Sequence, residues 1–198
     1  MVVNDRCQVE TAWGAGQDFE GNNWATYLTY FTQCTELLKV WILPEAPVTA
    51  SVSPGSVIFN SFFAVTLEGV GEGFDIYDGV WPGWCVDKEV NFLSPWEYEI
   101  FSSYDPELPP WADDGEQWDY INYILNNKHP DASMWEIQWA IWYFSDDGIV
   151  IPEAYTHAFE MVDDALANGE GFRPECGQYG AVILAAEGVQ KIFIEVDP

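Results

Sequence analysis

Two residue types in this sequence combine into one specific reaction, a cysteine thiol and a glutamine amide. Gln138 lies in the stretch 134–142, where Met134, Ile141 and Trp142 are its neighbours at helical spacing. Its amide therefore lies on or beside an apolar face, where an unpaired amide costs about 1–3 kcal/mol. Two interpretations follow. The glutamine is structural and bonded to backbone, or it has reacted with a cysteine thiol, which expels ammonia and leaves an internal thioester. A thioester is an acylating electrophile that lasts only where water is excluded, as in an aromatic-rich pocket.

The elements that must position these residues follow the order β, then α, then β. Aromatic and β-branched stretches, separated by Pro and Gly, predict strands between residues 24 and 101, and apolar strands return between 179 and 196. We predict a mainly β fold (a sandwich or barrel) with an α-helical insertion of about three helices, α+β. The predicted boundaries within this single domain are a β-rich body at 1–112, a helical insertion at 113–170 and C-terminal strands at 171–198 that complete the body.

Three helices are expected in the insertion. The first runs from about residue 116 to 126, and the second opens on the capping box Ser133–Glu136 and ends near Phe144. The third is expected to begin at Pro152, a residue favoured in the first turn, and to stop at Asn168–Gly169. Its buried stripe is predicted to be Tyr155, Phe159, Val162 and Leu166.

Composition excludes several function classes. The 198 residues include 33 acidic and 6 basic side chains, for a net charge of −27. So few cations cannot neutralise a phosphate backbone, which excludes nucleic acid, and an anionic membrane surface would repel the chain. The longest apolar runs are far shorter than the ~20 residues of a membrane span, so we predict no direct membrane insertion. The N-terminus has no basic or apolar leader region, so together with the four cysteines and few lysines we expect the mature form of an exported, extracellular or cell-surface protein.

Familiar enzyme motifs are absent from the sequence. His157–Glu160 is not a zinc-binding HExxH motif, and there is no nucleophile elbow, P-loop or dinucleotide fingerprint. Ser145–Gly148 lacks the spacing of an EF-hand, so an acidic surface that attracts calcium is the weaker alternative to a protein without cofactors. We predict no enzyme and no metal site. A glycan-binding module or glycosidase that uses tryptophan faces and paired carboxylates stays open as an alternative.

Three short motifs together resemble a known family. They are Trp84–Asp87, Ile121–Asn127 and Ile137–Trp142, and they look like the thioester domains of bacterial cell-surface adhesins. That family pairs a Cys, preceded by an aromatic or large apolar residue, with a Gln in an apolar-Gln-x-x-apolar motif. The resemblance covers roughly residues 74–196, and the family has a β-rich body with a helical insertion. Trp84 stands where Tyr, Phe or Leu is usual, and the separation of 53 residues between Cys85 and Gln138 is short for the adhesin members.

The resemblance implies a Cys85–Gln138 thioester that attaches the protein covalently to a nucleophile on a host or other surface. The expected surroundings of this bond are the residues next to each member in sequence or at helical spacing: Trp84, Asp87, Met134, Ile137, Ile141 and Trp142.

Cysteine parity favours a different structure. Disulfides Cys85–Cys176 and Cys7–Cys34 would use all four cysteines and contribute about 2–4 kcal/mol in an oxidising compartment. The alternative function is then a fibre or surface-layer subunit without a thioester, whose partners are other copies of itself. Such a subunit would polymerise by β-strand addition, with Ile192–Val196 or the N-terminal segment as the donor strand.

Overall fold

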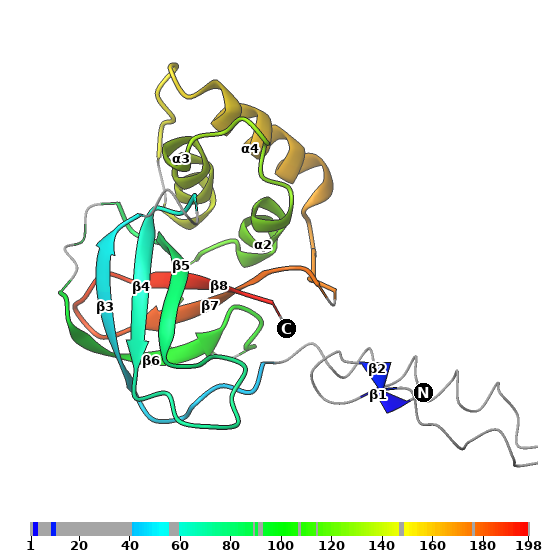
Figure 1. Cartoon of the computed structure of the whole chain (residues 1–198). Coiled ribbons are helices and arrows are strands. Elements are labelled where there is room, and N and C mark those ends of the chain that lie inside the picture. Colours follow the sequence, from blue (N-terminus) through cyan, green and yellow to red (C-terminus); the bar gives the residue numbers. More distant parts are fainter. Residues whose placement is uncertain are drawn as a thin grey trace, which may run out of the picture.

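Six antiparallel strands form a closed barrel in the computed structural model of this protein (Figure 1). Their order around the barrel is β3-β4-β5-β8-β7-β6, and pairing of β3 with β6 closes it. The strands are β3 Val48–Pro54, β4 Phe63–Glu68, β5 Gly79–Cys85, β6 Trp96–Ser102, β7 Gly180–Ala185 and β8 Ile192–Val196. The structure describes residues 41–55, 60–88, 90, 93–106, 108–113, 115–146, 149–175 and 177–197, and the backbone of two paired short strands, β1 Val2–Val3 and β2 Val9–Glu10.

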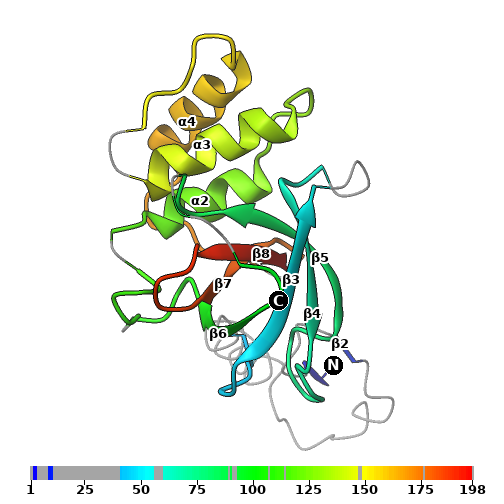
Figure 2. The ribbon, with the colours of Figure 1, turned by 90° about the vertical axis from the view of Figure 1, so that its left-hand side faces the viewer.

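Three helices lie between β6 and β7 in sequence and gather at one end of the barrel (Figures 1 and 2). They are α2 Trp118–Asn126, α3 Met134–Ser145 and α4 Thr156–Asn168. The predicted fold class, mainly β with an insertion of about three helices, is therefore confirmed, and the β part is a barrel. None of the helices in the described ranges combines the length and apolarity that crossing a bilayer requires.

Alternation along β8 divides the apolar residues into two cores. Ile192 and Ile194 face the barrel interior, where they join the inward residues of the other strands. Phe193 faces outward and meets Trp118 of α2 edge to face, with ring centroids 5.8 Å apart. The barrel therefore has one core inside it and a second core between its outer face and the helices.

Local sequence signals set the start of α3. The Ser133 hydroxyl accepts a hydrogen bond from the Glu136 N–H at 3.3 Å, and the Glu136 carboxylate accepts one from the Ser133 N–H at 2.9 Å. These reciprocal bonds are the predicted capping box, and they satisfy donors that the helix itself leaves unpaired.

The prediction for α4 was wrong at its start and for two of the four residues of its buried stripe. The helix begins at Thr156, because Pro152 opens a turn that the Tyr155 N–H closes with a 3.0 Å bond to the Pro152 carbonyl. Phe159 and Leu166 are exposed. The buried residues of the helix are Ala158, Met161, Val162 and Ala165, so Val162 of the predicted stripe is confirmed, and Tyr155 packs against the same core just before the helix.

The prediction that Ile192–Val196 serves as a donor strand was also wrong. This segment is β8, which pairs with β5 on one side and β7 on the other and is buried throughout. A strand with both edges paired and its side chains in the core is not available to another copy. The N-terminal segment suggested for the same role lies almost entirely outside the described residues.

Candidate functional site

Cys85 is the last residue of β5, and strand register places a glutamine next to its sulfur. Cys85 pairs with Ile192 of β8, so Gln190, two residues before Ile192, lies diagonally across from Cys85 on the same face. The Gln190 amide nitrogen Nε2 lies 2.7 Å from Cys85 Sγ. Since an amide C–N bond is 1.33 Å long, the Gln190 carbonyl carbon is at most about 4 Å from the sulfur. A thiol and an amide carbon at this distance are close to the geometry of attack.

The backbone carbonyl of Asp87 holds both reacting groups. It accepts a hydrogen bond from the Cys85 thiol at 3.0 Å and a second, short one from Gln190 Nε2. One acceptor therefore draws the thiol proton and the amide nitrogen towards the same point. The Cys85 thiol proton therefore lies close to the Gln190 amide nitrogen, which would leave as ammonia.

An ion-pair network fixes the segment that carries Gln190. The Lys191 carbonyl accepts from the Val86 N–H at 3.1 Å, which extends the ladder between β5 and β8 by one bond. The Lys191 ammonium lies 3.6 Å from the Asp87 carboxylate and makes a short ion pair with Glu116. Lys191 and Glu116 are both buried, so the pair links the start of β8 to the residues just before α2.

The Gln138 side chain contacts the backbone of Cys85. Its Oε1 accepts a hydrogen bond from the Cys85 N–H at 2.9 Å, and its Nε2 donates one to the Cys85 carbonyl at 2.8 Å. The Gln138 side chain is fully buried on α3, so the two bonds satisfy its amide without solvent. The structure therefore brings the predicted pair together. The amide that faces the sulfur, however, belongs to Gln190.

Burial changes the acidity of the Cys85 thiol. Loss of solvent raises its pKa to about 12, and the negative charges of Asp87 and Asp146 act in the same direction. The Trp142 indole N–H and the Gln190 amide act in the opposite direction, because they stabilise negative charge on the sulfur. The thiol is therefore neutral near pH 7, and its reaction with an amide depends on positioning rather than on a standing thiolate.

The predicted surroundings of the sulfur divide between two faces. Asp87 and Trp142 lie at Cys85, and Met134 is half-buried at the first position of α3. Trp84, Ile137 and Ile141 are buried in the core between barrel and helices instead. Alternation explains the case of Trp84, because consecutive residues of a strand point to opposite faces.

Cys85 is a free thiol in this structure, so the alternative disulfide Cys85–Cys176 is not formed. Cys7, Cys34 and Cys176 lie outside the described residues. The Cys7–Cys34 disulfide stays a prediction.

Gln190 is not among the site residues that the sequence predicts. It lies in a stretch whose apolar residues predict a strand, although alternation along 190–196 places its polar amide on the inward face with Ile192 and Ile194. A glutamine that begins the inward face of a barrel strand is the signal that identifies it. Its partner, however, became evident only from the register between β5 and β8.

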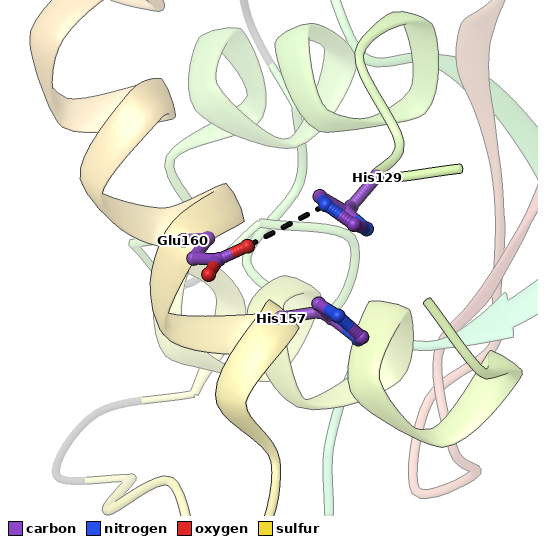
Figure 3. A group of neighbouring side chains, drawn as sticks. All are labelled: His129, His157 and Glu160. Atoms are coloured by element: carbon purple, nitrogen blue, oxygen red, sulfur yellow. Dashed lines mark ion pairs between the residues drawn. The ribbon is translucent and has the colours of Figure 1, made fainter. Parts of the chain in front are cut away.

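A second group of side chains, His129, His157 and Glu160, lies among the helices (Figure 3). Their ligand atoms are within 4.8 Å of one another, but the two imidazole rings stack, with centroids 4.2 Å apart and planes 13° apart. A histidine binds a metal through a lone pair in its ring plane, so two stacked rings do not converge on one ion. Instead, His129 lies 3.5 Å from the Glu160 carboxylate, and His157 lies 3.0 Å from that of Glu136. As placed, the group is a pair of stacked histidines with carboxylate partners. Asp147 and Gly148 of the acidic loop considered for calcium lie outside the described residues.

Comparison with solved structures identifies the fold. The N-terminal thioester domain of a surface protein from Clostridium perfringens matches with a TM-score of 0.50 at 10% identity, over 75% of this chain and 97% of that one. This chain has the thioester-domain fold. The resemblance predicted from the three motifs is confirmed at that level.

Two streptococcal structures also match. The N-terminal thioester domain of fibronectin-binding protein SfbI from Streptococcus pyogenes has a TM-score of 0.46 at 16% identity, over 78% of this chain and 96% of that one. The N-terminal domain of the pilus tip adhesin Cpa from the same organism has a TM-score of 0.45 at 13% identity, with 77% and 95% coverage. No protein-family model and no curated protein matches the sequence. The likeness to thioester domains is therefore one of fold, and the reactive residues must be argued from this chain.

Proposed function

We propose that this protein is the reactive module of a cell-surface adhesin, in which Cys85 and Gln190 form an internal thioester that attaches the protein covalently to a surface nucleophile. The observation that carries the proposal is the 2.7 Å separation between Cys85 Sγ and Gln190 Nε2. Gln190 replaces Gln138 as the proposed acyl donor. A Cys85–Gln138 bond stays a prediction that the contacts of Gln138 do not favour.

The proposed reaction balances with no added cofactor. Cys85 Sγ attacks the side-chain carbonyl carbon of Gln190, the S–C bond forms, the C–N bond breaks, and the thiol proton leaves with the amide as ammonia. When a nucleophile such as an amine later attacks the same carbon, the C–S bond breaks and the amine's proton passes to the sulfur. The chain ends with an amide cross-link at residue 190 and a free Cys85 thiol.

Burial supports a long-lived thioester here. Cys85 and Gln190 are only 4% and 3% exposed, so water has little access to the bond before a nucleophile reaches it. The aromatic rings of Phe62, Trp139 and Trp142 meet edge to face in this part of the barrel core. An apolar surrounding of this kind excludes water, which is the condition under which a thioester lasts.

The hydrogen bonds of Gln138 support a positioning role. A thioester at Gln138 would remove its amide nitrogen, which leaves the buried Cys85 carbonyl without this donor. It would also require the Cys85 sulfur to reach the Gln138 amide, which already binds the Cys85 backbone. With Gln190 as the acyl donor, both bonds of Gln138 survive the reaction and hold Cys85 in place.

The proposed role is not enzymatic in the turnover sense, because each molecule is consumed by one attachment. We place the protein outside the cell or on its surface, with a host or other surface nucleophile as its partner. The resemblance of the Cys85 motif to adhesin thioester domains, the shared fold and the acidic composition support this location. A module that reacts once suits display on a larger surface assembly.

Methylamine tests the proposal at residue level. Protein treated with methylamine is digested, and the modified residue is mapped by tandem mass spectrometry. We expect the methylamide on residue 190 and none in the Cys85→Ser control, which has no thiol to form the bond. An adduct on residue 138 would move the site to the original pair, and no adduct on either residue would overturn the proposed function.

A further inference from the structure

The Trp142 indole N–H is a buried donor in the same core as Cys85. Trp142 is 5% exposed, and its Nε1 has no hydrogen-bond partner among the described residues. Buried indole N–H groups ordinarily find an acceptor, so an unpaired one beside a reactive site needs a chemical explanation.

Three observations place Trp142 in the surroundings of Cys85. Trp142 lies one helical turn after Gln138 on α3, and Gln138 is bonded to the Cys85 backbone from both of its amide atoms. Trp142 shares the barrel core with Cys85. Edge-to-face contacts with Phe62 and Trp139, with ring centroids 5.8 and 5.2 Å apart, hold the indole in position. The indole N–H makes no hydrogen bond to the sulfur in this structure, but it is close enough to lower the pKa of the Cys85 thiol.

The carboxylates near the sulfur oppose a thiolate, and the nearby ammonium groups are engaged by other side chains. Asp87 and Asp146 are both negative and raise the pKa of the Cys85 thiol. The Lys191 ammonium is engaged by the Asp87 and Glu116 carboxylates, and the Lys88 ammonium lies over the Trp139 ring, 5.2 Å from its centroid. Within the described part of the chain, Trp142 and Gln190 are therefore the two side-chain donors that favour negative charge on Cys85.

We propose that the Trp142 indole N–H stabilises the Cys85 sulfur while it carries negative charge, both as the attacking nucleophile and as the leaving group when the thioester opens. This inference rests on the proposed thioester and adds a residue to its mechanism. The Gln190 amide nitrogen has departed as ammonia once the thioester exists. When a nucleophile then expels the sulfur, Trp142 is the one of the two donors that remains, and its N–H bonds to the departing thiolate until a proton arrives.

The first experiment does not need a thioester. In the Gln190→Ala background Cys85 is a free thiol, and its alkylation by iodoacetamide is followed on the peptide that contains residue 85, across a range of pH. Adding Trp142→Phe keeps an aromatic ring but removes the N–H. We expect alkylation at alkaline pH to slow by about tenfold, which corresponds to one unit of thiol pKa.

Trp118→Phe is the matched control. Trp118 of α2 is also buried and also has an indole N–H without an acceptor among the described residues, but it belongs to the core between the barrel and the helices. We expect its substitution to leave the alkylation profile unchanged. Equal profiles for the Trp142 variant and its parent, with both folded by circular dichroism, would overturn the inference. If Trp142→Phe does not fold, 3-benzothienylalanine at position 142 keeps the bicyclic shape without the N–H and is expected to slow alkylation equally.

The second experiment measures the leaving-group step in protein that has Gln190. Methylamine opening of the thioester is expected to slow in Trp142→Phe and to stay unchanged in Trp118→Phe. Unchanged opening in Trp142→Phe would contradict the leaving-group role. If the protein with Gln190 shows no loss of ammonia, the proposed function fails, whereas the alkylation result still decides whether Trp142 acts on the sulfur.

Discussion

The amide of Gln138 and the backbone of Cys85 form a closed pair of hydrogen bonds, at 2.9 Å from the Cys85 N–H and at 2.8 Å to the Cys85 carbonyl. The pair ties α3 to the end of β5, although 53 residues separate the two in sequence. A side chain has taken the place of a neighbouring strand at this point. It holds the sulfur towards Gln190 and Trp142.

We expect Gln138→Ala to destabilise the protein strongly. The substitution leaves a buried N–H and a buried carbonyl of Cys85 without their partners, at about 1–3 kcal/mol for each group. The free energy of unfolding from urea titration measures the change. Gln117→Ala is the control, because Gln117 is exposed and its side chain makes no cap bond, and we expect little change there. Equal stability of the two variants would contradict a positioning role for Gln138.

Glu136 makes the stability of the protein depend on pH. Desolvation raises the pKa of Glu136, but hydrogen bonds from Ser133 and His157 outweigh it and hold the pKa at about 2, below its value of about 4.3 in an unfolded chain. Because the folded-state pKa is the lower one, the stabilisation is complete above about pH 5 and is lost as pH falls from about 4 to about 2. Glu136→Gln is expected to lower the thermal midpoint near neutral pH, by an amount that shrinks through this window.

The control for that experiment is Glu153→Gln, which changes an exposed carboxylate on the turn before α4. We expect it to shift the midpoint little. A Glu136→Gln difference that stays constant from neutral to acidic pH would show that the capping carboxylate contributes through shape and not through charge.

The general fold followed from the sequence because its signals are local. The order β, then α, then β, the approximate positions of the three helices and the capping box at Ser133 could be predicted from neighbouring residues, but the bounds of β3 and β5 could not. Closure of the barrel could not, because it depends on pairing of Val48–Ala50 with Trp96–Tyr98, which are far apart in the chain.

The reactive pair shows the same limit. Cys85 and Gln138 were found from local motifs, and they do lie together. Gln190 was not found, because a polar residue at the start of an apolar strand is ordinary until the register with β5 is known. The Cys85↔Ile192 pairing puts it beside the sulfur. Only the three-dimensional structure distinguishes the glutamine that binds the backbone from the glutamine that faces the thiol.

Removing Lys191 should cost about 3–5 kcal/mol, because the Glu116 carboxylate stays buried after it loses this ion pair. We expect Lys191→Met alone to be much less stable than the double variant Lys191→Met/Glu116→Gln, which removes the buried Glu116 charge as well. Urea titration of both single variants and the double variant gives the coupling energy. Additive effects would contradict a direct interaction.

Asp146 is expected to suppress the reactivity of the free Cys85 thiol. Burial is the main cause of the raised thiol pKa, and the Asp146 charge adds to it. Asp146→Asn keeps an oxygen acceptor for the Lys88 N–H but removes the charge. In the Gln190→Ala background it should lower the thiol pKa, and so speed alkylation of Cys85 by iodoacetamide. Asp163→Asn on α4 is the control, and equal rates in the two variants would contradict the electrostatic effect.

Intact mass tests the central claim most directly. Mass spectrometry of the untreated protein is compared with the Gln190→Ala, Gln138→Ala and Cys85→Ser variants, each against its own calculated mass with any disulfides counted. We predict a deficit of one ammonia in the unmodified sequence that disappears completely in Gln190→Ala and Cys85→Ser and persists, at least in part, in Gln138→Ala. A deficit that survives Gln190→Ala, or its absence from the unmodified sequence, would contradict a Cys85–Gln190 thioester.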